Sequence, residues 1–235
     1  MTSAYTFPMT ASRCVGLLGG VGVGAASYYY RELAKVCTSK GVDLDLVMVN
    51  AETPKVLAFA QAGDSSGMAG YANSFIERMK LAGAEFAVIP SVTGSFGARE
   101  LASISPLPVL DLFTVVTEEI ARRAIKRVAV FGTRFVIESN MFDSVPGVQF
   151  IKPQADEIDT IHSNYVQMAM DSRGTEEQYI TLRELALRLC EREGLDAIVL
   201  GGTDLSLIFN ESNTDFPHVD CAAVHLRAIA ARMLV

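Results

Sequence analysis

Short β-branched apolar runs alternate along the chain with longer segments in which apolar residues recur at helical spacing. The runs predict strands near residues 14–18, 44–50, 85–90, 108–111, 127–131, 148–152 and 196–200. The amphipathic segments between them predict helices near residues 25–39, 64–82, 113–124, 155–171, 176–193 and 220–233. Because strands that alternate with helices form βαβ units, the pattern predicts an α/β fold with parallel sheets.

Two pairs of segments share their character and follow one another at nearly the same spacing. Residues 13–19 (RCVGLLG) resemble 127–133 (RVAVFGT), and residues 84–91 (AEFAVIPS) resemble 195–202 (LDAIVLGG). The repetition predicts two similar halves, one of residues 13–112 with 217–235 and one of residues 113–216. Ligands of open parallel sheets bind beyond the carboxyl ends of the strands. We therefore expect Ser91 and Gly202 to lie on opposite walls of a cleft between the halves.

Charge and cysteine usage indicate which kinds of partner and which cellular compartment fit the sequence. The chain has 27 acidic and 20 basic residues, a net charge of -7, and the basic residues form no stripe, which argues against nucleic acid and membrane surfaces as partners. Its apolar runs are shorter than the roughly 20 residues of a membrane span. The four cysteines and three histidines lack metal-ligand spacing, so we expect no metal site and a reducing cytoplasm.

A glycine-rich stretch, residues 19–24 (GGVGVG), follows the first predicted strand and opens a helix. Backbone N–H groups at such a helix start can hold an anion, and Gly20 is the candidate ligand of a substrate carboxylate. The same stretch fits a dinucleotide pattern, but the second strand ends at Asn50 rather than at an acidic residue, which argues against nicotinamide. A tight turn with close packing is the alternative reading.

Several motifs stand in a characteristic order along nearly the whole chain. They are residues 16–20 (GLLGG) with 29–31 (YYR), 81–85 (LAGAE) leading into 88–93 (VIPSVT), 132–134 (GTR), 155–157 (ADE), 200–204 (LGGTD), and Asp220 with His225. Together they resemble the aspartate/glutamate racemase superfamily, which inverts acidic amino acids without pyridoxal phosphate. The resemblance implies two flavodoxin-like domains with short parallel sheets, related by a pseudo-twofold axis. It also implies that the protein uses no cofactor and forms a homodimer.

The resemblance places one catalytic cysteine in each half, at the positions that Ser91 and Gly202 occupy here. A serine hydroxyl is a far weaker acid than a thiol, and glycine carries no proton at all. We therefore expect altered chemistry on a small carboxylate or amino acid, such as decarboxylation, a lyase reaction or one-sided proton transfer. A conventional aspartate or glutamate racemase and a non-catalytic ligand-binding protein are the alternatives.

The candidate site residues follow from these motifs. The catalytic candidates are Ser91, Asp204 and Cys221, with Gly202 as the vacant cysteine position, and the substrate-binding candidates are Gly20, Asn50, Lys55, Thr93, Gly94, Ser95, Arg134, Thr203 and His225. Hydroxyls with backbone donors suit a carboxylate or an oxyanion. Structural alternatives stand beside these roles: Ser and Thr cap helices, Cys221 suits a small buried apolar position, and His225 suits a structural hydrogen bond.

Overall fold

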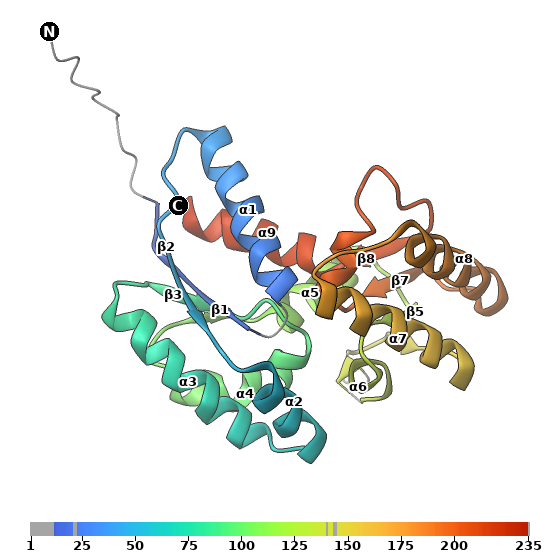
Figure 1. The fold of residues 1–235 in the computed structure, drawn as a ribbon, viewed down its shortest axis with the longest axis horizontal. Coiled ribbons are helices and arrows are strands. Elements are labelled where there is room, and N and C mark those ends of the chain that lie inside the picture. The colour runs from blue at the N-terminus through green and yellow to red at the C-terminus, as the bar shows by residue number, and fades with distance from the viewer. Residues whose placement is uncertain (1–11, 21–22, 140, 143–144, 235) are drawn as a thin grey trace, which may run out of the picture.

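The computed structural model describes residues 12–20, 23–139, 141–142 and 145–234. Within these residues the chain forms two four-stranded parallel sheets, which lie side by side (Figure 1). The first has the order β2-β1-β3-β4, from β1 (Val15–Gly19), β2 (Leu46–Asn50), β3 (Phe86–Val88) and β4 (Val109–Leu110). The second repeats that order as β6-β5-β7-β8, from β5 (Arg127–Phe131), β6 (Gln149–Phe150), β7 (Ala197–Leu200) and β8 (His218–Asp220). The predicted fold, two flavodoxin-like domains of similar topology, is confirmed.

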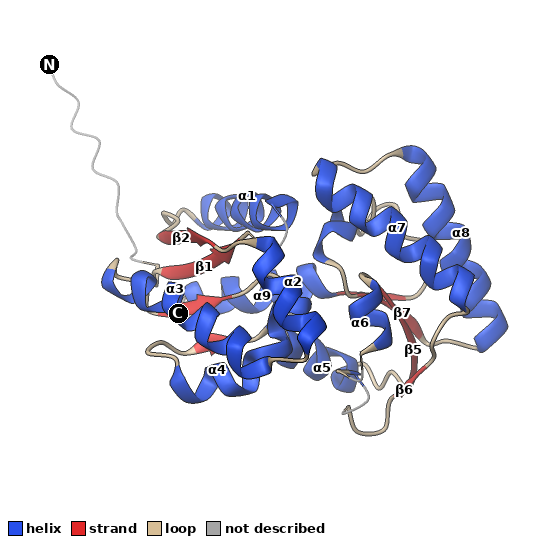
Figure 2. Cartoon of the chain, turned by 60° about the horizontal axis from the view of Figure 1, so that its bottom comes forward, coloured by secondary structure: helices blue, strands red, loops and turns tan. Residues whose placement is uncertain are grey.

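Helices connect the strands and cover both sheets (Figure 2). They are α1 (Val23–Lys40), α2 (Thr53–Ala62), α3 (Ser65–Leu81), α4 (Ala98–Ile104), α5 (Leu112–Arg122), α6 (Arg134–Glu138), α7 (Ala155–Asp171), α8 (Glu176–Glu193) and α9 (Cys221–Met233). Two short 3-10 helices, η1 (Thr93–Gly97) and η3 (Thr203–Leu207), follow β3 and β7. The sequence pattern locates the long helices to within a few residues but misses α2, α4, α6 and β8.

Capping residues explain where several helices begin. Asp111 accepts a hydrogen bond from the Thr114 N–H at 2.8 Å at the start of α5. Asp220 accepts one from the Ala223 N–H at 3.0 Å at the start of α9. An Asp at the N-cap satisfies a backbone donor that the helix itself leaves free. The same cap therefore follows the last strand of each sheet.

Each sheet is buried between two layers of helices. In the first half, α3 packs on one face, and α1 with α9 packs on the other through residues such as Tyr29 and Ile229. In the second half, α7 and α8 cover one face, while α5 and the start of α9 cover the other. Residues 217–235, which we expected in the first half, thus divide: β8 joins the second sheet, whereas most of α9 packs on the first.

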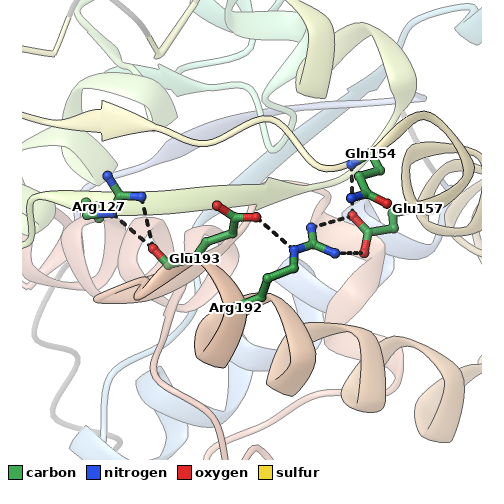
Figure 3. Close-up of polar contacts among 5 residues, drawn as sticks. All are labelled: Arg127, Gln154, Glu157, Arg192 and Glu193. Atoms are coloured by element: carbon green, nitrogen blue, oxygen red, sulfur yellow. Dashed lines mark hydrogen bonds and ion pairs between the residues drawn. The ribbon is translucent and has the colours of Figure 1, made fainter.

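A polar network connects several elements of the second half (Figure 3). The guanidinium of Arg192 on α8 makes two hydrogen bonds, of 2.8 and 2.9 Å, to the carboxylate of Glu157 on α7. Glu157 also accepts the Gln154 N–H at 2.8 Å, and Arg127 on β5 donates to the Glu193 carbonyl at 2.9 Å. Arg192 pairs with the Glu193 carboxylate as well. The network joins α7, α8 and β5, away from the strand ends where ligands are expected.

No helix in the described part of the chain is long and apolar enough to cross a membrane.

Candidate functional site

The two strand ends that the sequence singles out lie in contact with each other. In the first half β3 leads through Pro90 and Ser91 into η1, and in the second half β7 leads through Gly202 into η3. The hydroxyl of Thr203 donates a hydrogen bond to the Pro90 carbonyl at 3.3 Å, across the boundary between the halves. We call this region, made of residues 90–95 and 201–204, the junction.

The first side of the junction is a turn capped by its own hydroxyls. The Ser91 hydroxyl oxygen accepts the Gly94 N–H at 3.1 Å, and the Ser95 hydroxyl donates to the Ser91 carbonyl at 3.2 Å. Ser91, Thr93 and Ser95 are all buried. Among the described residues no side-chain base hydrogen-bonds to the Ser91 hydroxyl. Nothing in this arrangement activates the serine as a nucleophile.

The second side of the junction is filled by an aromatic ring. A Cβ added to Gly202 would lie 2.1 Å from Cε2 and 2.7 Å from Cδ2 of Tyr165, a residue of α7. The backbone of Gly202, at φ -105° and ψ 119°, is in the β region that any residue can adopt. Glycine is therefore required here by the ring of Tyr165, which occupies the space that a cysteine side chain would take.

Tyr165 is also part of a buried pair of acids. Its hydroxyl donates to Oδ2 of Asp204 at 3.0 Å, and both side chains are buried. Burial raises the pKa of Asp204, although the bond from Tyr165 partly opposes it, and burial with the charge of Asp204 raises the pKa of Tyr165 well above its ordinary value. Each group therefore favours its protonated form more than it would in water.

The other oxygen of Asp204 points at the first half of the chain. A Cβ on Gly24, at the start of α1, would lie 2.6 Å from Oδ1. Within the described residues Oδ1 has no hydrogen-bond partner of good geometry, although the nearby N–H of Ala25 lowers the pKa of Asp204. A carboxylate beside a helix N-terminus is electrostatically favourable. Asp204 thus links the second side of the junction to α1.

Gly20 holds a close approach between two loops. Its φ is +86°, and a Cβ there would lie 2.0 Å from the Ala51 carbonyl oxygen. The Gly20 carbonyl accepts a hydrogen bond from the Thr53 hydroxyl, and the Asn50 amide nitrogen donates to the Ala51 carbonyl at 2.9 Å. These contacts agree with the tight-turn reading. Residues 21 and 22 of the glycine-rich stretch lie outside the described residues, so the anion-binding hypothesis at that loop stays a prediction.

The two candidate cations are already paired with acids. Lys55 forms an ion pair with Glu52 at 2.6 Å, on the surface. Arg134 forms an ion pair with Glu138 at 2.8 Å and a second one with Asp159. Their charges are largely compensated without a ligand. In the part of the chain that the structure describes, no group of three or more His, Cys, Asp or Glu is arranged to hold a metal ion.

His225 and Cys221 sit in the core rather than in an open site. Nδ1 of His225 lies 3.2 Å from the Tyr29 hydroxyl, and Nε2 lies 3.0 Å from the Leu110 carbonyl. Burial lowers the pKa of His225 to about 4, so its ring is neutral and both nitrogens are occupied. Burial, with the nearby charge of Asp220, raises the pKa of the Cys221 thiol well above its ordinary value. Cys221 therefore packs as a small apolar residue.

Tyr165 is the site residue that the sequence analysis missed. It belongs to the apolar stripe of α7, with Ile158, Ile161 and Met168. A tyrosine within such a stripe carries a hydroxyl that must find a polar partner once it is buried. This need for a polar partner is the signal that the sequence offers for Tyr165. The partner, Asp204, follows β7 and lies far away in the sequence.

Comparison with known proteins identifies the family. The family model for Asp/Glu/Hydantoin racemase matches residues 18–229. The chain belongs to the Asp/Glu/Hydantoin racemase family. A protein from Yersinia pestis assigned as an Asp/Glu racemase is 20% identical and superimposes with a TM-score of 0.80, covering 95% of this chain and 100% of that chain. An aspartate racemase homologue from Pyrococcus horikoshii OT3 is 18% identical, with a TM-score of 0.76, covering 93% of this chain and 99% of that chain.

The same racemase-family fold also occurs in a decarboxylase. The Gly74Cys mutant of arylmalonate decarboxylase is 16% identical, with a TM-score of 0.54, covering 94% of this chain and 93% of that chain. At these identities the structural likeness concerns the fold alone.

Proposed function

We propose that this family member acts without a cofactor on a small carboxylate or amino acid at the junction, by decarboxylation, a lyase reaction or another one-sided proton transfer. The observation that carries the proposal is the ring of Tyr165 against Gly202, with a Cβ distance of only 2.1 Å. This packing leaves no room for a thiol on the second side of the junction. A phenol and a carboxyl group stand on that side instead.

Two-sided racemisation does not suit these groups. Inversion of an α-carbon requires a base on one face and an acid on the other. The Ser91 hydroxyl accepts the Gly94 N–H and has no side-chain base bonded to it in the described residues. When carbon dioxide leaves an α-carbon, the bond electrons pass to the enolate, and one proton then returns to the carbon. A single acid on one side is sufficient for that sequence.

Asp204 is our candidate for this acid. Burial raises its pKa, so its protonated form is more populated near neutral pH than that of a surface aspartate. The hydroxyl of Tyr165, 3.0 Å from Oδ2, holds the carboxyl group in place. Tyr165 is therefore a positioning residue in this proposal, and Asp204 is the group that gives the proton to the enolate.

Hydroxyls from both sides of the junction bind the carboxylate in this proposal. Ser91, Thr93 and Thr203 provide hydroxyls near backbone donors, a combination that stabilises a carboxylate or the developing enolate charge. Because all three are buried, a ligand enters only when the bond between Thr203 and the Pro90 carbonyl opens. The paired surface cations Lys55 and Arg134 have no part in this arrangement. We retain a homodimer in the cytoplasm as an expectation.

The test is a screen of small monocarboxylates, dicarboxylates, malonates and amino acids by proton NMR in deuterium oxide. We expect at least one acid to lose carbon dioxide or another group, or to take up deuterium at its α-carbon. Asp204→Asn should then lower the rate at least a hundredfold while the acid still binds, and the exposed control Ser103→Ala should leave the rate unchanged. Equal conversion of both enantiomers of an amino acid, or no reaction in the whole panel, would contradict the proposal.

A non-catalytic ligand-binding protein is the second candidate, and the closed packing of the junction favours it. Ser91, Thr203 and Asp204 are 6%, 3% and 1% exposed. For such a protein a small acid raises the melting temperature without any change in the NMR signals of the acid. The same panel therefore separates the two functions.

A further inference from the structure

A hollow lies away from the junction, between β8, the end of α5 and the start of α9. Its volume is about 320 Å³, and neither Ser91, Tyr165 nor Thr203 lines it. Sites for small molecules usually have volumes of about 300 to 1,000 Å³. The hollow, which we call the β8 cavity, is therefore large enough for a small metabolite and lies at the lower end of that range.

Two positive side chains line the β8 cavity. Arg123 uses one guanidinium nitrogen to donate to the His218 carbonyl at 2.7 Å, and Arg227 has no hydrogen bond or ion pair with the described residues. Both arginines lie close enough to Glu119 to lower the pKa of that carboxyl group. Glu119 itself is paired with Arg122 at 2.8 Å. The two guanidinium groups thus line the cavity without a direct ion pair to a described residue, although the charge of Arg227 reaches both Glu119 and Asp220.

Two negative side chains line the β8 cavity as well. The carboxylate of Asp220 accepts the Ala223 N–H at 3.0 Å, and Glu211 lines the cavity beside it. Burial raises the pKa of Asp220, and the N–H groups of Ala223 and Ala222, with the smaller effects of the His218 and Arg227 charges, offset this only in part. Burial, together with the charges of Asp220 and Glu211, also raises the pKa of Tyr28 to about 12. The charges of both acids thus reach Tyr28, and Asp220 lacks a cation that compensates its charge fully.

The β8 cavity also has apolar lining residues. Phe216 and Val224 are buried residues that line the cavity, and Pro217 lies beside them. A ligand that fits this surface combines an anionic group, a cationic group and an apolar body. Of the four charged residues only Asp220 is half-buried, and its charge is the one that is costly to leave without a full partner.

We propose that the β8 cavity binds a small zwitterionic α-amino acid with an apolar side chain. The carboxylate lies against Arg123 and Arg227, which can bind it with charge-assisted hydrogen bonds. The ammonium group lies toward Asp220 and Glu211. The side chain packs against Phe216. This site is independent of the junction and of the reaction proposed there.

The first test compares leucine with two analogues that each lack one charge. Isothermal titration is carried out with either enantiomer of leucine, with 4-methylpentanoate and with isoamylamine. The comparison separates the contributions of the carboxylate and of the ammonium group of leucine. We expect at least one enantiomer of leucine to bind at least tenfold more tightly than both analogues. Equal affinity for an analogue, or no binding of leucine, would overturn the proposal.

The second test locates the bound leucine with variants. Arg227→Gln removes a guanidinium that forms no hydrogen bond or ion pair with the described residues, so we expect it to weaken leucine binding at least tenfold without loss of folding. Glu211→Gln should weaken it at least threefold. Arg99→Gln makes the same charge change on the exposed surface of α4 and should change the affinity less than twofold.

A final variant distinguishes the β8 cavity from the junction. Thr203→Val changes the junction and should leave leucine binding within twofold of the native value. If Thr203→Val abolishes binding while Arg227→Gln has no effect, leucine occupies the junction, and the β8 proposal is wrong. These titrations measure binding only, so their outcome is independent of whether any acid is turned over at the junction.

Discussion

Replacing Gly202 by alanine tests the packing on which the proposed chemistry depends. The new Cβ would lie 2.1 Å from Cε2 of Tyr165, whereas unstrained carbon atoms stay at least about 3.5 Å apart. The ring would have to move by about 1.4 Å, but it lies within the core and is held to Asp204 at 3.0 Å. Overpacking of this kind costs about 1 to 3 kcal/mol, and a strained bond to a buried carboxyl group adds about 1 kcal/mol or more. We expect Gly202→Ala to lower the free energy of unfolding by about 3 kcal/mol.

A double-mutant cycle isolates the cause. Tyr165→Ala alone should cost about 3 to 5 kcal/mol, because it removes a buried ring. In that background Gly202→Ala should cost less than about 0.5 kcal/mol or even stabilise the protein, because the backbone at Gly202 is already in an ordinary β conformation. The coupling energy should therefore be about 2 to 3 kcal/mol. Urea unfolding followed by circular dichroism measures all four proteins.

Gly70 supplies the matched control for this cycle. It lies within α3, and nothing lies within 4 Å of a Cβ added there. Gly70→Ala should stabilise the helix by about 0.5 to 1 kcal/mol. The reasoning is refuted if Gly202→Ala costs less than about 0.5 kcal/mol, or if its cost is the same with and without the ring. The cycle also implies that Gly202→Cys restores a usable thiol only when Tyr165 is replaced by a smaller residue.

Three further expectations concern stability. Gly20→Ala should cost at least about 2 kcal/mol in urea unfolding, because φ is +86° and the Ala51 carbonyl blocks the Cβ; a neutral effect would contradict this. Glu157→Gln should cost about 1 to 3 kcal/mol at pH 7. Because Arg192 lowers the pKa of Glu157, that difference should disappear as the pH falls through this lowered value, and an equal difference at pH 3 would contradict it. The pKa of His225 is about 4 against an ordinary 6.5, so the unfolded chain takes up the proton at a higher pH than the folded chain. Stability should therefore fall as the pH is lowered from about 6.5 to 4. An NMR titration midpoint of His225 near 6.5 would exclude this.

The elements that could be predicted from the sequence are those with a repeating pattern of their own. β1, β5 and β7 are short apolar runs, and α7 and α8 are amphipathic helices of 17 and 18 residues with capping boxes. By contrast, α6 has five residues, too few for a period to show, and β8 (His218–Asp220) begins and ends with a polar residue, so it forms no apolar run. Such short elements form because neighbouring strands and helices supply their partners, which a local pattern does not contain.

The candidate site could likewise be predicted from the sequence only in part. Hydroxyls and glycines directly after apolar strands led to Ser91 and Thr203, since strand ends converge in parallel sheets. The ring beside Gly202 and the acid beside Arg134 come from α7, far away in the sequence. A pattern indicates that a buried tyrosine or a surface arginine will find a partner, but only the fold determines which residue that partner is.

The last helix, α9, belongs to both hydrophobic cores. Its first turn places Cys221 and Val224 in the core under the second sheet, and its later turns place Leu226, Ile229 and Met233 in the core under the first. Excising either half would therefore expose apolar surface that the other half normally covers. The two sheets, although nearly equivalent in topology, depend on one shared segment for their integrity and should melt in a single cooperative transition.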